Sequence, residues 1–239
     1  MLNFRLLFIP AAFAIIGSIG ASNKHNVQSE QRSLQESQNN VTRNNVLSTD
    51  LCQSYKIDFP NTTDTFIHWT NGGGADSEWI NVDNWEYGYL PGVYRKNQII
   101  MAEDDVATVH CNATYMKASV KLELTEQATL DVQANLNIGK RLALRKMAKV
   151  TQSKQSFVLV GKKLYLDAIY EITERAKLQV KRGMRLADNG RLVINGDKTI
   201  VSIQDDTTIN GWLTYNFGQT GTGTFDIQGE LTIEEKVQF

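Results

Sequence analysis

A stretch of the chain between about residues 120 and 200 repeats itself roughly every 20 to 22 residues. Residues 136–142 (LNIGKRL) are echoed by residues 158–164 (VLVGKKL) and, more loosely, by residues 178–184 (LQVKRGM). A second short apolar segment precedes each copy, at 128–132, 148–150 and 168–172. A unit this short cannot bury its apolar face alone and must stack on its neighbours. Because no helical pattern lies between the copies, the repeat predicts an all-β chain folded as a single-stranded parallel β-helix. We expect a right-handed coil, because parallel crossovers almost always have that hand.

The 239-residue chain divides into four zones on composition. Residues 1–20 combine Arg5, an apolar run and small residues at 18–20, which predicts a cleaved secretory signal peptide. The run is short and interrupted by Pro10, so we expect no transmembrane segment. Residues 21–50 are polar and almost without aromatics, which predicts a disordered leader. Residues 51–119 are rich in aromatics and glycine and precede the coils, whereas residues 120–239 should supply the coils and a C-terminal cap.

Secretion is consistent with two further features of the sequence. Asn40, Asn61 and Asn112 each begin an Asn-X-Thr sequon and are candidate glycosylation sites. Cys52 and Cys111 should pair in an oxidising compartment, and the alternative is two buried free thiols. A bridge that closes this loop would contribute roughly 4 kcal/mol in the chain-entropy model. Neither cysteine has the Cys or His neighbours that a metal site requires, so no metal site is expected.

The aromatic zone carries a pattern of Trp, a glycine turn, Trp, Asn-Trp, then Gly and Pro. Its parts are residues 68–74 (HWTNGGG), Glu78-Trp79 and residues 84–92 (NWEYGYLPG). The pattern resembles the segment that precedes the first coils of secreted and autotransporter-type β-helices. That resemblance implies that the tryptophans cover the open end of the solenoid, where strand edges would otherwise be exposed. The alternative is a sugar-binding surface made of the rings of Trp69, Trp79, Trp85, Tyr87 and Tyr89.

An enzyme must be considered, because β-helices include pectin-cleaving enzymes. Such sites need carboxylates that converge on one groove as general acid and base. The candidate acidic pieces at residues 61–64 and 204–206 lie far apart in the sequence, and neither His68 nor His110 has a plausible nucleophile partner. The pairs Asp104-Asp105 and Asp205-Asp206 are expected to be turn residues. We therefore predict no enzymatic activity and no cofactor, with a polysaccharide-degrading enzyme as the third hypothesis.

The charge distribution is uneven along the repeat. Between residues 140 and 191 there are fourteen Lys and Arg residues against four Asp and Glu residues. Equivalent positions of stacked coils lie about 4.8 Å apart. Like charges stacked in this way repel by roughly 0.2–1 kcal/mol per contact unless something neutralises them. The repeat predicts two adjacent rows of cations, one of Lys140, Lys162 and Lys181, the other of Arg141, Lys163 and Arg182.

These rows predict a ladder that binds anions: an acidic protein, an acidic glycan or phosphorylated head groups. The alternative is a solvated face of long side chains that keeps a strand edge from pairing. Nucleic acid is not expected, because few aromatics are interleaved with the basic residues and the chain is predicted to be secreted.

One short motif lies in the polar leader. Arg32-Ser33-Leu34-Gln35 resembles a degenerate form of the RxLR motif of oomycete secreted effectors, with Gln35 where that family has Arg. The acidic block that often follows in the family is reduced to Glu36 here. The resemblance implies a protein that is secreted by a plant pathogen, is delivered into a host cell and dampens immune responses. The alternative is that the motif is part of an ordinary solvated tether.

Together these features predict a secreted, non-enzymatic, effector-like protein. It would act on host tissue and suppress host defence by binding an acidic target through the basic face of the solenoid. The alternative is an extracellular matrix or cell-surface β-helix that binds acidic glycans.

Overall fold

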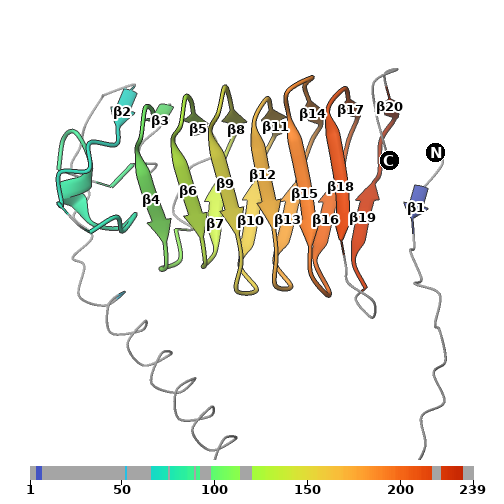
Figure 1. The fold of residues 1–239 in the computed structure, drawn as a ribbon, viewed down its shortest axis with the longest axis horizontal. Helices are drawn as coiled ribbons and strands as arrows, with labels where there is room; N and C mark the ends of the chain where they lie inside the picture. The colour runs from blue at the N-terminus through green and yellow to red at the C-terminus, as the bar shows by residue number, and fades with distance from the viewer. Residues whose placement is uncertain are drawn as a thin grey trace, which may run out of the picture. The chain divides into compact units, whose positions relative to one another are not determined.

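The computed structural model describes residues 4–6, 52, 66–74, 76–88, 90–91, 98–113, 120–216 and 222–233. Residues 32–35, Asn40, Asn61 and Tyr89 lie outside the described residues, so the predictions made for them stay predictions. The chain forms two compact units, and the described residues other than Cys52 belong to the unit made of Met1–Ile9 and Ile57–Phe239. This unit is a solenoid of parallel β-strands (Figure 1), which confirms the predicted fold class.

The chain visits three parallel sheets in turn, and each complete coil adds one strand to each. Sheet 1 contains β2 (Phe66–His68), β3 (Gln98–Met101), β5 (Lys121–Leu124), β8 (Arg141–Leu144), β11 (Lys163–Leu166), β14 (Met184–Leu186), β17 (Thr207–Ile209) and β20 (Leu231–Ile233). Sheet 2 contains β4 (Val106–Val109), β6 (Thr129–Val132), β9 (Lys149–Gln152), β12 (Ile169–Ile172), β15 (Arg191–Asn195) and β18 (Trp212–Asn216). Sheet 3 contains β7 (Leu136–Ile138), β10 (Phe157–Val160), β13 (Lys177–Val180), β16 (Ile200–Ile203), β19 (Thr224–Ile227) and β1 (Phe4–Leu6).

Two short elements depart from this pattern. Strand β1 pairs with β19 antiparallel, with Phe4 opposite Ile227, whereas the other named strands pair in parallel. A 3-10 helix, η1 (Val82–Asn84), lies in the aromatic segment between β2 and β3.

The core consists of apolar columns that run along the solenoid axis. Side chains alternate between the inner and outer faces of each strand, so inner residues of successive coils stack at the strand spacing. One such column in sheet 3 contains Leu136, Val158, Leu178 and Val201, all of which are buried. A one-residue slip would turn a whole column toward solvent, so these columns fix the register.

The coils differ in length, although their strands stay in register. Along the column described above, the step from Val158 to Leu178 is the shortest and the step from Leu178 to Val201 is the longest. The predicted period therefore holds for the central coils and lengthens afterwards. The differences lie at the corners between sheets. The chain is shorter between Val132 and Leu136 than between the residues paired with them, Gln152 and Val158.

The sequence predicted that the coils start at residue 120, but in the structure they begin further upstream. Strand β3 pairs in parallel with β5, and β4 pairs in parallel with β6. Strand β2 joins them, with Phe66 opposite Gln98, and this step along the chain is longer than the steps between the later coils. The aromatic segment lies within this long step. Because it makes the first coil longer than the later ones, the first coil does not follow the period of the repeat.

The segment between β2 and β3 lies at the β2–β4 end of the solenoid (Figure 1). Its three tryptophans, Trp69, Trp79 and Trp85, form a buried cluster. The ring centroids of Trp69 and Trp79 both lie close to that of Trp85, at 4.9 and 4.8 Å, in edge-to-face arrangements. The Trp85 indole N–H donates to the Trp79 carbonyl at 2.9 Å. Asn84 is fully buried and accepts a hydrogen bond from the Gly73 N–H at 2.8 Å. The three indoles therefore pack against one another, whereas the Tyr87 side chain is about half exposed.

Cys52 and Cys111 are both disulfide-bonded, which confirms the predicted bridge. Cys111 is buried, and the neighbouring sequon residue Asn112 is exposed. Glycosylation of Asn112 stays a prediction.

Candidate anion-binding site

The six cations of the predicted ladder lie at the corner between sheet 3 and sheet 1. Arg141 and Lys163 begin β8 and β11 on the sheet 1 side. Lys181 directly follows β13 on the sheet 3 side. The other three lie in the connections between the two sheets, and they are Lys140, Lys162 and Arg182. The structure thus brings all six to one edge of the solenoid.

The register within the ladder differs from the prediction by one residue in the third coil. Val160 pairs with Val180, and Leu164 pairs with Met184, so the offset between the two coils is the same on both sides of this corner. Lys162 therefore aligns with Arg182 rather than with Lys181. The predicted row assumed that the basic turn sits at the same place in each repeat, but in the third copy it comes one residue earlier relative to the strand.

We call the row of Lys140, Lys162 and Arg182 the corner row. Its backbone groups are tied into the ladder of hydrogen bonds, since the Lys163 N–H donates to the Lys140 carbonyl at 3.1 Å and the Arg182 N–H donates to the Lys162 carbonyl at 3.0 Å. These bonds hold the three charged positions on successive coils. The lysines of the row are half-buried and Arg182 is exposed.

The neighbouring row in sheet 1 also differs from the prediction. Arg141 pairs with Lys163 as expected, but the next position is occupied by Gly183 instead of Arg182. On the other side, Arg141 pairs with Lys121. The row is therefore Lys121, Arg141 and Lys163. Lys121 could have been found from the sequence, because Lys121 and Arg141 each begin an alternating segment of the same form, KLEL and RLAL.

Most of these cations have no acidic partner in the part of the chain that the structure describes. Within the described ranges, five of the six predicted ladder residues form no ion pair, and they are Lys140, Lys162, Lys163, Lys181 and Arg182. Among the described residues, no carboxylate pairs with these five side chains. Arg141 is the exception, with a guanidinium nitrogen 3.6 Å from Glu123.

Glu123 marks one end of the basic surface. Its carboxylate accepts a hydrogen bond from the Arg145 guanidinium at 2.7 Å. That guanidinium also lies over the ring of Tyr165, 5.2 Å from the ring centroid, within cation–π range. The structure thus adds Arg145 to this surface, which the repeat alone did not indicate, because Arg145 lies in a turn beyond the strand.

A pair of aspartates marks the other end. Met184 pairs with Thr207, so the position after Arg182 in the corner row is Asp205. The Asp205 carboxylate accepts a hydrogen bond from the Asp206 N–H at 3.0 Å, and the Asp206 carboxylate accepts one from the Glu230 N–H at 3.1 Å. This confirms that the two aspartates are turn residues. The corner row is therefore basic over three coils and becomes acidic on the fourth.

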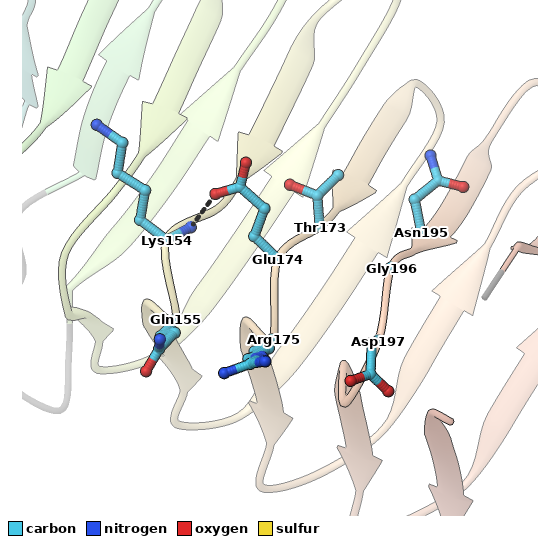
Figure 2. A pocket seen from close by; sticks show the side chains of 8 residues that line it. All are labelled: Lys154, Gln155, Thr173, Glu174, Arg175, Asn195, Gly196 and Asp197. Carbon is cyan, nitrogen blue, oxygen red and sulfur yellow. Dashed lines mark hydrogen bonds between the residues drawn. The ribbon is translucent and has the colours of Figure 1, made fainter. Parts of the chain in front are cut away.

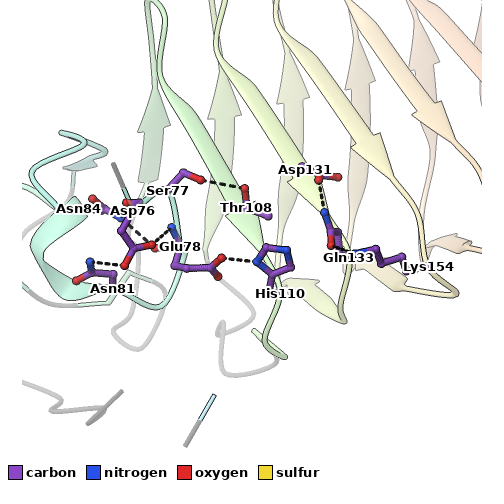
Figure 3. A network of polar contacts seen from close by, with 10 residues as sticks. All are labelled: Asp76, Ser77, Glu78, Asn81, Asn84, Thr108, His110, Asp131, Gln133 and Lys154. Carbon is purple, nitrogen blue, oxygen red and sulfur yellow. Dashed lines mark hydrogen bonds and ion pairs between the residues drawn. The ribbon is translucent and has the colours of Figure 1, made fainter. Parts of the chain in front are cut away.

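A separate polar network joins the aromatic segment to sheet 2 (Figure 3). The His110 imidazole contacts the Glu78 carboxylate, a partner that the sequence did not reveal. The Ser77 hydroxyl lies 3.1 Å from the Thr108 hydroxyl, so it does not form a Ser–His pair with His110. Nucleophilic catalysis needs the base within reach of the nucleophile, and this network does not provide that geometry.

Asp105, which the sequence predicted to be a turn residue, is hydrogen-bonded to the backbone. Its carboxylate accepts a hydrogen bond from the Ala102 N–H at 2.7 Å. Partial burial raises the pKa of Asp105, and the hydrogen bond from Ala102 opposes that shift. Asp105 thus stabilises the turn between β3 and β4, as expected for a turn aspartate.

In the part of the chain that the structure describes, no three His, Cys, Asp or Glu side chains gather in a way that could hold a metal ion. No helix among these residues has both the length and the apolar character needed to cross a membrane. Comparison with protein-family models, with curated proteins and with solved structures gives no match.

Proposed function

We propose that this protein is a secreted, non-enzymatic binding protein. It holds an acidic target against the corner between sheet 3 and sheet 1, where the corner row and the row of Lys121, Arg141 and Lys163 lie; we call this surface the basic corner. The proposal rests on one observation: the corner row places a cation on each of three successive coils, and none of these cations has an acidic partner among the described residues. Like charges at the strand spacing repel one another, and a bound anion relieves that repulsion. Binding of an anion is therefore favoured by the free protein's own electrostatics.

The regular spacing of the cations favours an extended target. The corner row and the adjacent row of Lys121, Arg141 and Lys163 each place one cation per coil, about 4.8 Å apart along the axis. An acidic protein segment or an acidic glycan carries charges in series and can contact several coils at once. A solvated face with no ligand is the competing explanation, and the following experiment separates the two.

Substitution of Lys140, Lys162 and Arg182 by Gln is expected to weaken retention on heparin or polygalacturonate. The elution salt concentration should fall, and the dissociation constant at low salt should rise about tenfold or more, because three charge-assisted contacts are lost. Chromatography on the immobilised polyanion measures the change. The control replaces Lys146, Lys149 and Arg191 by Gln, which removes the same formal charge from the edge where sheet 1 passes into sheet 2. Lys146 and Lys149 differ from the corner-row cations in that they pair with Glu126 and Glu171. Equal retention of both variants would show that the corner row is merely solvated.

The proposed setting of this binding is host tissue, where the protein would suppress host defence as an effector. The resemblance of residues 32–35 to the RxLR motif supports this setting, as does the predicted signal peptide. Delivery into a host cell follows from the same resemblance. The alternative is a matrix or cell-surface protein that attaches to acidic glycans, and it needs no function for residues 32–35.

Alanine substitution across residues 32–35 distinguishes the effector from the matrix protein. For an effector, we expect loss of uptake and of immune suppression in an infiltrated leaf, while polyanion retention stays unchanged because the basic corner is intact. A defence-response assay in leaf tissue and the same heparin column provide the two readouts. Full host activity of the substituted protein would contradict the effector assignment.

A further inference from the structure

A second cationic surface lies at the opposite edge of sheet 3, where the chain enters that sheet from sheet 2. An open groove of about 800 Å³ is lined there by Gln155, Phe157, Arg175, Lys177, Lys198 and Ile200. We call it the sheet 3 groove. None of these residues belongs to the basic corner, and the repeat of apolar residues in the sequence did not indicate them.

Turns in an unusual backbone conformation build one wall of the groove. Gln155, Arg175 and Lys198 have φ values of 58°, 64° and 57°, in the left-handed region that non-glycine residues seldom adopt. Each stands two positions before the start of its strand, and the first strand residues Phe157, Lys177 and Ile200 are aligned in register. The turns therefore stack on successive coils. Such conformations cost free energy of order 1 kcal/mol or more each. They also occur at Glu103, Glu126 and Lys146 in the turns between sheet 1 and sheet 2, so they shape the corners of the coils and do not by themselves mark a site.

The cations of the groove have no ion pairs among the residues that the structure describes, although two carboxylates lie nearby. Glu174 accepts a hydrogen bond from the Lys154 N–H at 3.1 Å, and both side chains extend to the other side of the turn from Arg175 (Figure 2). Asp197 accepts a hydrogen bond from the Thr222 N–H at 2.9 Å, which lowers the pKa of its carboxyl group, and the charges of Lys198 and Arg175 act in the same direction. Both acids accept backbone hydrogen bonds, and Asp197 offsets part of the charge of Lys198 and Arg175 without forming an ion pair. The groove still carries three exposed cations against this one nearby carboxylate: Arg175, Lys177 and Lys198.

The floor of the groove combines these cations with apolar surface. Phe157 and Ile200 are half-buried and flank Lys177 in the same row of sheet 3. A sugar ring presents C–H groups on its faces and hydroxyl or acidic groups at its edge. The Phe157 ring can pack on such a face while the neighbouring cations bind the acidic edge.

We infer that the sheet 3 groove binds an acidic polysaccharide, with uronate or sulfated sugar units lying across successive coils. The groove is open along the axis and carries Arg175 and Lys198 on neighbouring coils, about 4.8 Å apart. This spacing of cations along an open groove suits a polymer that carries a charge on each sugar unit. A single head group would be held better by an enclosed pocket. The inference goes beyond the proposed function, because it names a further site and the class of its ligand and uses residues separate from the basic corner.

Titration of the full secreted chain with galacturonate and heparin hexasaccharides tests the inference. Replacement of Arg175, Lys177 and Lys198 by Gln is expected to weaken binding of at least one of them about tenfold. The control variant with Lys146, Lys149 and Arg191 replaced by Gln should bind like the original protein. Phe157→Ala should weaken binding of the same hexasaccharide about fivefold. The salt dependence of binding should not change, because the substitution removes an apolar contact and no charge. Maltohexaose, a neutral sugar of the same length, should not bind.

The outcomes separate this inference from the proposed function. Loss of binding in the groove variant, with binding kept in the corner-row variant, would support the groove and reject the basic corner as the binding site of these hexasaccharides. The reverse result would reject the groove and leave the proposed function in place. Failure of both hexasaccharides to bind, or equal binding by the groove and control variants, would overturn the inference. Thermal unfolding of each variant confirms that the surface substitutions leave the fold intact.

Discussion

Replacement of Trp79 by alanine is expected to lower the free energy of unfolding by about 3–5 kcal/mol, the largest single effect in this chain. Trp79 is fully buried, and its ring packs edge-to-face on Trp85 with centroids 4.8 Å apart. The deletion leaves a cavity the size of an indole and loosens the segment that holds the Trp85 N–H. Denaturant unfolding followed by tryptophan fluorescence and circular dichroism measures the loss.

Phe66→Ala is the matched control for this prediction. Phe66 lies in β2, near the same end of the solenoid, but its side chain is about half exposed. We expect a loss of about 1 kcal/mol or less, as for most partly exposed positions. Trp79→Phe should fall between the two, because a smaller ring refills part of the cavity. If Trp79→Ala were no more destabilising than Phe66→Ala, the tryptophan cluster would not stabilise the coils.

The second large effect is expected at a buried polar pair inside the solenoid. Gln152 is fully buried in a column otherwise filled by Val132 and Ile172. Its amide donates to the carbonyls of Ser156 and Lys177, at 3.1 and 2.8 Å. Its oxygen accepts a hydrogen bond from the Tyr170 hydroxyl at 3.0 Å. Burial raises the pKa of Tyr170, so this hydroxyl stays protonated and remains a donor.

Gln152→Leu is expected to lower the free energy of unfolding by about 2–3 kcal/mol, although leucine suits an apolar column. The substitution leaves the Tyr170 hydroxyl buried without a partner, and it removes a donor from two carbonyls, each of which is costly. Adding Tyr170→Phe to this variant should recover about 1 kcal/mol, since the unpaired hydroxyl is gone. A double-mutant cycle by denaturant unfolding measures the coupling. Strictly additive effects would show that the two side chains do not stabilise each other.

The sequence predicted the coils because their inner positions repeat, and it was less reliable where outer residues and corners decide the geometry. Leu136, Val158 and Leu178 were aligned correctly from their pattern, and the structure stacks them. Lys181 was placed one residue out of register, because the third basic turn sits differently on its coil. Apolar alternation fixes strands, but the length of the chain at a corner leaves no periodic signal.

The sheet 3 groove and the Gln152–Tyr170 pair escaped prediction for related reasons. Arg175 and Lys198 look like ordinary exposed turn residues until the coils are aligned, since their sequence neighbours show no shared motif. Gln152 stands at the last, inward-facing position of β9, where apolar alternation gives no reason to expect a polar residue. Both features are formed by residues that lie on neighbouring coils. Which residues become neighbours depends on the register between the coils.

The unequal coil lengths have a consequence for how such a protein can change. Shorter and longer coils coexist with unbroken strand pairing, because the additional residues are confined to the corners. Closing a slightly longer loop costs little free energy. Corners can therefore gain or lose residues through evolution while the interior columns stay fixed, so that new surface chemistry arises on an unaltered scaffold.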